Sequence, residues 1–312
     1  MNLNRRAARI ASRLVRDADF FGIRTSKTSS GATIVDCGVE APGGFAAGLA
    51  LARICLGGLG SAAVVPSPYP DLPGPAVRVA TDRPLQACMA SQYAGWKLQA
   101  PGFFAMGSGP MRTLGSQEKL FDEYDLRESS SVAVGVLESR KLPGEEVVAQ
   151  IADACKLSPS DVMLLVAPTA SVAGALQVVA RSVETTMHKL ETLGVDLRIV
   201  RHGYGVAPLP AVGTNDLVAL GRTNDAILYG ADVTLWVDCD DALIAEFGPR
   251  VPSESSRDYG EPFGKLFDRY DRDFYKIDPH LFSPAVARFV NLQTGRTHSF
   301  GTLRPDLLVY DA

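Results

Sequence analysis

SVAGALQVVARSVETTMHKLETL, residues 171–193, is a continuous run of helical periodicity in the middle of a 312-residue chain. Ser171 is a plausible N-cap residue, and Gly194 follows where a left-handed helix stop is expected. The apolar side chains recur at the three- and four-residue spacing of one helix face. They are Val172, Leu176, Val179, Val183, Met187 and Leu190. The pattern predicts one helix packed on a core along this face.

A polar row runs beside the apolar face of the same stretch. It consists of Arg181, Glu184, His188 and Glu191 and lies about 120° around the helix from the apolar face. Arg181 and Glu184 are three residues apart, so their side chains can touch. One interpretation is an exposed ion pair of little energetic value. The other makes Glu184 a general base whose position and ionisation are set by Arg181. The spacing leaves both open.

Composition and charge exclude several classes of protein. Hydrophobic residues make up 46% and charged residues 21% of the chain, which is ordinary for a globular protein of two domains. The net charge of −4 gives no basic field for binding nucleic acid. Five widely spaced cysteines without a CxxC fit reduced thiols better than disulfides or a zinc site. The four histidines form no metal-binding motif, so we expect no metal.

The sequence shows no membrane or export signal. Residues 1–22 are rich in arginine but follow a regular helical stripe, so we expect a helix of the folded domain. The apolar stretch 46–65 contains Arg53 and several glycines and is not a membrane span. We therefore expect a cytoplasmic protein without a membrane partner.

From Ser131 the chain alternates between strand and helix patterns. Strands are expected at 132–137, 162–167 and 197–201, with helices at 144–156 and 171–193 between them. This β-α-β-α-β order predicts the fold class α/β (α+β). A final hairpin, 288–292 with 298–303, has no partner within its own short tail. We therefore expect residues 1–104 and 241–312 to form a first, discontinuous α/β domain, and 105–240 to form a second one carrying Arg181 and Glu184.

Three further segments hold candidate binding residues or surface residues. Gly107, Ser108 and Gly109 can offer backbone N–H groups to an anion, although such turns are more often plain loops. Residues 221–240 are expected to form a loop and then two strands around Gly230, with polar groups at the start of the loop. The aromatic, charged tail after residue 256 is expected to wrap over a core as a surface segment.

Taken together, these segments resemble the methenyltetrahydromethanopterin cyclohydrolase family. The matching stretches are GATIVDCGV (31–39), ICLGGLG (54–60), QYAGWK (92–97), FFAMGSGP (103–110), GRTNDAILYG (221–230), DYGEPF (258–263) and DFYKIDPHLFSP (273–284), besides the central helix. They follow the family's order over nearly the whole chain. The resemblance implies two α/β domains with a substrate pocket between them, a pterin as the small-molecule partner, no cofactor, and a homotrimer.

The resemblance also implies a reaction and the residues that carry it. The reaction is reversible hydrolysis of 5,10-methenyltetrahydromethanopterin to the 5-formyl compound, a step of one-carbon metabolism, including that of methylotrophs. Its catalytic Arg and Glu match Arg181 and Glu184. Eight residues inside the matching motifs are candidate substrate-binding residues: Gln92, Tyr93, Lys97, Phe104, Ser108, Arg222, Asn224 and Asp225. The alternatives are a hydrolase of another folate-like pterin, a non-catalytic pterin- or phosphate-binding protein and, beyond these, a structural oligomer.

Overall fold

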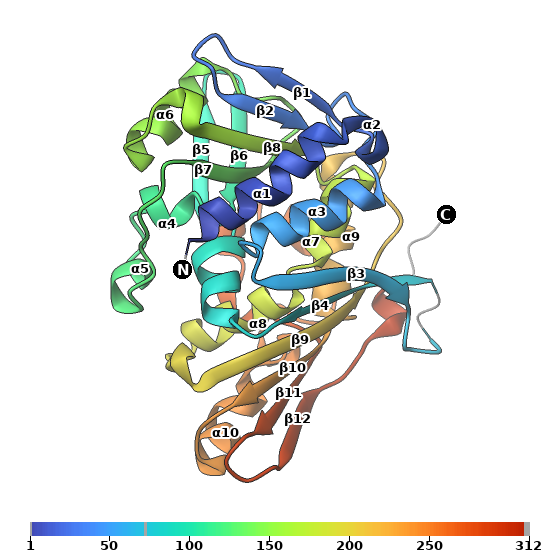
Figure 1. Cartoon of the computed structure of the whole chain (residues 1–312). Coiled ribbons are helices and arrows are strands. Elements are labelled where there is room, and N and C mark those ends of the chain that lie inside the picture. Colours follow the sequence, from blue (N-terminus) through green and yellow to red (C-terminus); the bar gives the residue numbers. More distant parts are fainter. Residues whose placement is uncertain (1, 72–73, 309–312) are drawn as a thin grey trace. The chain divides into compact units, whose positions relative to one another are not determined.

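The computed structural model describes residues 2–71 and 74–308 and shows two compact units (Figure 1). The first unit comprises Met1–Ser61 and Gln86–Gln177, and the second comprises Ala62–Leu85 and Val178–Ala312. Both units combine helices with one six-stranded sheet in the described ranges, so the α/β class is confirmed.

The helices of the first unit are α1 (Leu3–Arg16), α2 (Ala18–Phe21), α3 (Phe45–Cys55), α4 (Arg112–Gly115), α5 (Leu120–Glu123) and α6 (Glu145–Cys155). Helix α7 (Val172–Val179) begins in this unit, and a π-helix, η1 (Leu85–Gln92), enters it. The second unit holds α8 (Ser182–Thr192), α9 (Asp216–Leu228), α10 (Asp241–Phe247) and α11 (Phe263–Arg269). Single 3₁₀ turns lie at Pro159–Asp161, Leu197–Ile199, Gly248–Arg250, Ser253–Ser255, Phe274–Lys276, Pro279–Leu281 and Pro305–Leu307.

The sheet of the first unit is mixed and has the order β1-β2-β8-β7-β6-β5. Its strands are β1 (Arg24–Lys27), β2 (Thr33–Asp36), β5 (Trp96–Ala100), β6 (Phe103–Ser108), β7 (Ala133–Glu138) and β8 (Val162–Ala167). Strand β8 runs parallel to β2 and β7, and the outer pairs β1–β2, β5–β6 and β6–β7 are antiparallel. The expected parallel unit 132–167 is confirmed.

Alternating side chains divide this sheet's core into two layers. Val134, Val136 and Leu165 pack with α1 and α3 on one face. On the other face, Leu137 and Leu164 pack with α6 and the β5–β6 hairpin. Figure 1 shows α1 and α3 lying across their face of the sheet. The period of two therefore fixes which side each helix covers.

Asp36 organises the turn after β2. Its carboxylate accepts hydrogen bonds from the backbone N–H groups of Gly38, Val39, Glu40 and Ala41 at 2.7–2.9 Å. Burial raises the pKa of Asp36, but these four donors outweigh it and hold the pKa below its usual value. The aspartate of GATIVDCGV thus has a structural role.

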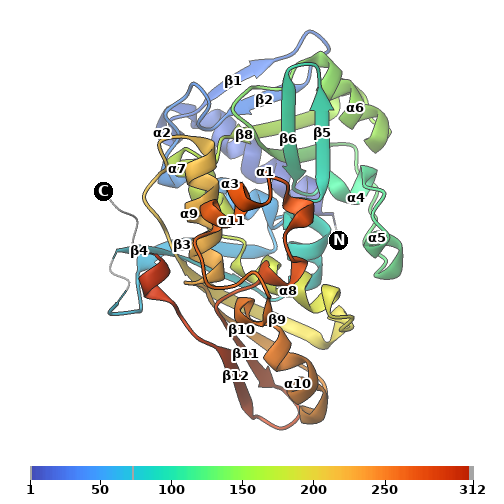
Figure 2. The ribbon, with the colours of Figure 1, turned by 180° about the vertical axis from the view of Figure 1, so that it is seen from behind.

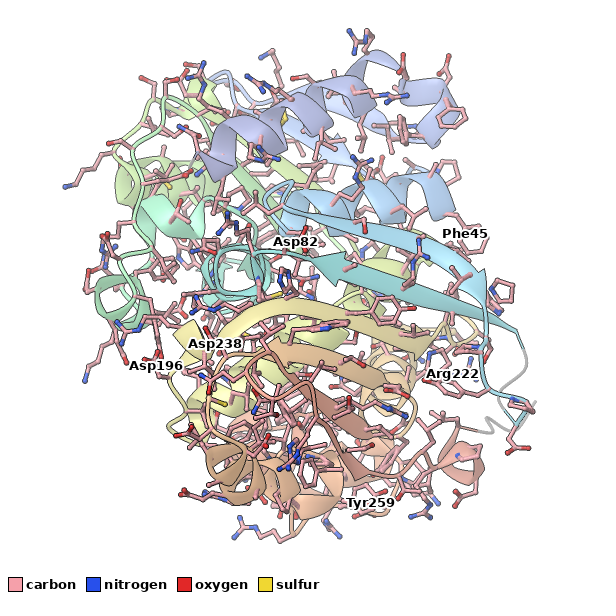
Figure 3. All side chains as sticks on the ribbon, turned by 60° about the horizontal axis from the view of Figure 1, so that its bottom comes forward. Phe45, Asp82, Asp196, Arg222, Asp238 and Tyr259 are labelled. Carbon is pink, nitrogen blue, oxygen red and sulfur yellow. The ribbon has the colours of Figure 1, made fainter. Side chains whose placement is uncertain are left out.

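The sheet of the second unit has the order β12-β11-β10-β9-β4-β3. Its strands are β3 (Gly60–Pro66), β4 (Pro75–Thr81), β9 (Val200–Pro208), β10 (Asp232–Val237), β11 (Val286–Asn291) and β12 (Thr297–Gly301). The β11–β12 pair confirms the expected final hairpin. The exposed Asp82 and the half-buried Asp238, labelled in Figure 3, pair with His202 and Arg201 of β9, each at 2.9 Å.

The strand pairing differs from the sequence-based expectation in two respects. Strand β9 does not continue the parallel sheet of β7 and β8 but joins β10 and β4 in the second sheet. The hairpin β11–β12 also joins β10, so residues 241–312 group with 178–240 and not with 1–104. Local pattern shows that a strand exists, whereas its neighbours depend on long-range packing.

Candidate functional site

The helix expected over residues 171–193 is two helices. The backbone leaves the α-helix at Ala180 and Arg181, where Arg181 has φ −92° and ψ 8°, and resumes it at Ser182. The apolar stripe continues across the break, because Val179 and Val183 on either side are both buried. A periodicity count therefore sees one helix where the chain makes two.

Arg181 and Glu184 are both buried at the beginning of α8. Their exposed fractions are 6% and 5%, so the interpretation as an exposed ion pair is wrong. Arg181 occupies the N-cap position and Glu184 the first turn. The N-terminal end of a helix favours negative charge because its first N–H groups point outward. The backbone thus offers a local reason for placing an acid at Glu184.

Two glycines of β9 bring the first turn of α8 close to the sheet. A Cβ atom on Gly203 would lie 2.6 Å from Cγ1 of Val183, and one on Gly205 would lie 2.4 Å from Oγ of Ser182. Both distances are too short for real atoms, so α8 packs directly on the strand's backbone at these two positions. The sequence HGYG, with glycine at every second residue, thereby sets the position of Glu184 relative to the sheet.

Lys189 connects the C-terminal half of α8 by hydrogen bonds to the chain around the aromatic segment after residue 256. This lysine is fully buried, and its Nζ donates to Oγ of Ser255 at 3.2 Å and to the carbonyl oxygen of His280 at 2.5 Å. Burial lowers its pKa to about 8. The tail itself packs through Phe263, Phe267 and neighbouring rings, as expected of an aromatic wrap. The helical spacing in the sequence did not predict a role for Lys189. Its hydrogen bonds help to position α8.

Arg222, Asn224 and Asp225 lie on helix α9. The prediction of a loop at the start of residues 221–240 is therefore wrong. Asn215 caps this helix through the N–H of Val218, and a single strand, β10, follows. Gly221, Thr223 and Asn224 are weak helix formers, which hid a helix whose buried residues Ala219, Ala226 and Ile227 are apolar.

The three polar residues of α9 have different surroundings. Nη1 of Arg222, labelled in Figure 3, lies 3.3 Å and 3.4 Å from the carbonyl oxygens of Ala211 and Val212. Asn224 donates to the carbonyl of Leu220 at 2.9 Å. Asp225 is buried and accepts from the N–H of Phe263 at 2.7 Å, at the beginning of α11, which lies beside α9 in Figure 2. Burial raises the pKa of Asp225 to about 7.

The other five predicted residues belong to the first unit. Gln92 is buried at the end of the π-helix η1, and the N–H of the half-buried Tyr93 closes a π-type turn onto the carbonyl of Cys88 at 2.8 Å. Such turns are frequent at functional sites. Lys97 and Phe104 are exposed on the paired strands β5 and β6, with Nζ of Lys97 5.8 Å from the ring centroid of Phe104. These two side chains are open to a ligand.

Ser108 and Gly109 are engaged by the protein. Ser108 is fully buried, and its hydroxyl donates to the carbonyl of Val136 at 3.3 Å. The N–H of Gly109 donates to the carbonyl of Ser91 at 2.7 Å. An anion at 107–109 would therefore lack this N–H, and Gly107 and Ser108 belong to strand β6 and not to the more common plain loop.

Three further findings bear on the chemistry of the described residues. All five cysteines are buried, with free thiols. The described ranges contain no group of three His, Cys, Asp or Glu side chains arranged to hold a metal ion. No helix within 2–71 or 74–308 has both the length and the apolar character needed to cross a membrane.

Comparison with known proteins extends beyond the motifs to nearly the whole chain. Residues 2–310 match the family model described as Cyclohydrolase (MCH). A Rhodopirellula baltica protein named methenyltetrahydromethanopterin cyclohydrolase is 47% identical over 286 residues, covering 90% of this chain and 86% of the relative. Proteins of the same name from Methanosarcina barkeri and Xanthobacter autotrophicus are each 44% identical, covering 91% and 96% of this chain and 89% of each relative. By sequence over its whole matched length, the chain belongs to the MCH cyclohydrolase family.

Proposed function

We propose that this protein hydrolyses 5,10-methenyltetrahydromethanopterin to 5-formyltetrahydromethanopterin, with Glu184 activating water and Arg181 orienting it. Family membership supports the reaction. The observation that carries the residue roles is the burial of both charged side chains at the N-terminal end of α8. Buried charged groups are expensive and are enriched at functional sites.

The substrate's own chemistry defines what the protein must add. The methenyl carbon lies between two nitrogens as an amidinium cation and is already electrophilic, so the proposed reaction needs neither metal nor cofactor. Water is the missing reactant, because its pKa of about 15.7 makes it a poor nucleophile at neutral pH. A carboxylate within hydrogen-bond reach of that water can take its proton as the C–O bond forms.

The proton balance assigns Glu184 two successive tasks. It accepts one proton from water while the oxygen bonds to the methenyl carbon, which gives a neutral hydroxymethylene adduct. It then returns this proton to N10 as the C–N10 bond breaks, and the adduct's hydroxyl releases its proton to solvent as the formyl group forms. One proton is released for each cation hydrolysed.

Arg181 serves this chemistry through its fixed charge and planar donors. A guanidinium three residues from Glu184 can hold the carboxylate in one orientation and keep it ionised. It can also donate to the oxygen that becomes the formyl group. Its positive charge opposes that of the substrate, and the negative charge of Glu184 offsets this repulsion.

The eight other candidates stay proposed substrate-binding residues with different means of action. Lys97 and Phe104 are exposed and can contact a ligand directly. Ser108 and Asp225 are hydrogen-bonded within the protein and would act by holding their neighbours in place. Gln92, Tyr93, Arg222 and Asn224 complete the set.

The test follows the loss of the methenyl chromophore together with proton release in a weakly buffered assay containing a chelator. We expect wild-type protein to release one proton per methenyl group lost, with the chelator present. Glu184→Gln is expected to bind the substrate but to lose about 10²- to 10⁴-fold in kcat.

Glu191→Gln is the matched control, because Glu191 lies about two turns further along the same helix face. It should retain near-wild-type turnover. Substrate binding without turnover by the wild type would favour a non-catalytic binding protein, and turnover of a different pterin alone would identify another hydrolase. Normal turnover by Glu184→Gln would remove Glu184 from the mechanism.

The cytoplasmic location, the role in methylotrophic one-carbon metabolism and the homotrimer belong to the same proposal. They are supported by the resemblance of the sequence motifs to the family.

A further inference from the structure

Arg112 is a fully buried arginine outside the residues assigned so far. It follows FFAMGSGP at the beginning of α4, and its side chain has no exposed surface. Its guanidinium contacts two rings, with Cζ 4.9 Å from the ring centroid of Tyr93 and 5.1 Å from that of Phe121. Burying an arginine is costly, so its surroundings indicate what it serves.

The contacts of Arg112 converge on the end of the π-helix η1. Its Nη1 donates to the carbonyl of Met89 at 2.7 Å, and the N–H of Gly109 donates to the carbonyl of Ser91 at 2.7 Å. The last carbonyls of any helix lack partners within the helix. Here a side chain and a backbone N–H of the segment 109–112 supply them, immediately before the QYAGWK segment (Gln92–Lys97).

Glu118 holds the guanidinium from the opposite side. Its carboxylate accepts from Nη2 of Arg112 at 2.7 Å through each oxygen, and from Nε at 3.3 Å. The hydroxyl of Ser116 donates to the same carboxylate at 2.7 Å. A Cβ atom on Gly95 would lie 2.8 Å from both oxygens of Glu118 and 2.7 Å from Cε1 of Tyr93. Glycine at position 95 thus lets the QYAGWK segment lie against the ion pair.

We propose that Arg112, held by Glu118, is a positioning residue that fixes the QYAGWK segment in the conformation that binds the pterin. The inference rests on the proposed function, since it takes Gln92 and Tyr93 as pterin-binding residues. Arg112 itself is buried and acts through Met89, Tyr93 and Glu118. In Figures 1 and 2, α4 lies near the open end of the β5–β6 hairpin, opposite its turn.

Arg127, which follows helix α5, provides a matched control. It also stacks on Phe121, with Cζ 5.7 Å from the centroid, and it pairs with Asp122 at 2.6 Å. Its Nη1 donates to the carbonyl of Ser116 at 2.9 Å, and Ser116 lies outside η1 and the QYAGWK segment. Arg127→Met therefore removes an arginine, an ion pair and a ring contact, while the hydrogen bonds of Arg112 to Met89 and Glu118 stay in place.

The experiment compares Arg112→Lys, Arg112→Met, Gly95→Ala and Arg127→Met in steady-state hydrolysis of methenyltetrahydromethanopterin. Hydrogen exchange at the amides of Tyr93 and Gly109 provides a readout that needs no activity. Gly95→Ala disturbs the contact between the QYAGWK segment and the Arg112–Glu118 ion pair without removing Arg112. It therefore tests the proposed role of Arg112 even if Arg112→Met does not fold.

We expect Gly95→Ala and Arg112→Met to raise KM by about tenfold or more, with kcat changed less than about threefold. Arg112→Lys should recover part of this loss, because one ammonium can reach one of the two acceptors but cannot bridge both. Hydrogen exchange at Tyr93 and Gly109 should accelerate most in Gly95→Ala and Arg112→Met and less in Arg112→Lys. Arg127→Met should match wild type in both KM and exchange.

Unchanged KM and unchanged exchange in Gly95→Ala and Arg112→Lys would overturn the proposal. Equal effects in Arg127→Met would also overturn it, because they would show only general destabilisation. If wild-type protein does not hydrolyse the substrate, the proposed function fails separately. Hydrogen exchange at Tyr93 and Gly109 then tests whether Arg112 fixes the QYAGWK segment. Exchange in the Gly95 and Arg112 variants equal to that of wild type would reject this role.

Discussion

Arg181 and Glu184 show at the scale of single residues how burial changes the meaning of a spacing. Three-residue pairs of opposite charge are common on exposed helix faces and contribute little there. At the beginning of α8 both side chains are more than nine-tenths buried, where each charge must be compensated. This burial makes the pair a candidate site.

The first residue-scale prediction concerns Arg181. Arg181→Leu should lower kcat by roughly 10²- to 10³-fold, because it removes the charge and donors proposed to orient Glu184. Arg181→Lys keeps the charge and should lose less. Steady-state rates of both variants, with thermal melting as a folding control, check this. Equal activity of Arg181→Leu and wild type would return the pair to a structural role.

Asp225 yields a prediction about stability and pH. Burial raises its pKa from 3.8 to about 7, so between these values the folded protein holds a proton that the unfolded chain has lost. The stability that this group contributes is therefore present below pH 4 and is lost as pH rises toward 7. The free energy of unfolding falls by at most about 1.4 kcal/mol per pH unit in this range.

Asp225→Asn removes this dependence while keeping an oxygen that can accept from the N–H of Phe263. Denaturant unfolding at pH 4.5 and pH 8 should show the variant gaining stability relative to wild type at the higher pH. The same difference in stability at both pH values would contradict a raised pKa.

At the scale of secondary-structure elements, the contact between α8 and β9 is set by residues without side chains. Gly203 and Gly205 leave the strand's backbone open to Val183 and Ser182. Valine has one preferred rotamer in a helix and cannot easily move aside. The alternate glycines thereby place the first turn of α8, including Glu184, close against the sheet.

Gly203→Ala should therefore displace the first turn of α8. We expect kcat to fall by about tenfold to a hundredfold through misplacement of Glu184, and stability to fall by about 1–3 kcal/mol. Gly144→Ala is the control, since a Cβ atom there meets nothing within 4 Å and its φ is −89°. Turnover and denaturant unfolding measure both effects. Identical behaviour of the two variants would show that the close approach is unimportant.

At the scale of the whole molecule, each unit is assembled from segments distant in the chain. Strand β2, for example, pairs with β8, and β4 pairs with β9, more than a hundred residues away in each case. Such pairings require long loops to close before the sheet forms, so neither unit is a contiguous piece of sequence.

The whole-molecule prediction is the proposed homotrimer. Light scattering during size-exclusion chromatography should give three times the chain mass of 33.3 kDa. Because a closed ring of identical subunits buries one heterologous interface per chain, the mass should persist on dilution through the micromolar range. A mass equal to one chain at assay concentration would reject the trimer and leave the chemistry at Glu184 untouched.

The sequence by itself determined the α/β class, most of the helices and strands, and the family, because periodicity and motifs are local properties of the chain. It did not reveal helix α9 or the break at Arg181, since weak helix formers and an uninterrupted apolar stripe misled the local pattern.

Only the tertiary structure decided which strands share a sheet, that Arg181 and Glu184 are buried, and that Arg112 is buried with Met89 and Glu118 as partners. The physical reason is the same in each case. Burial, strand neighbours and the partners of a guanidinium depend on residues far away in sequence, and no local spacing records them.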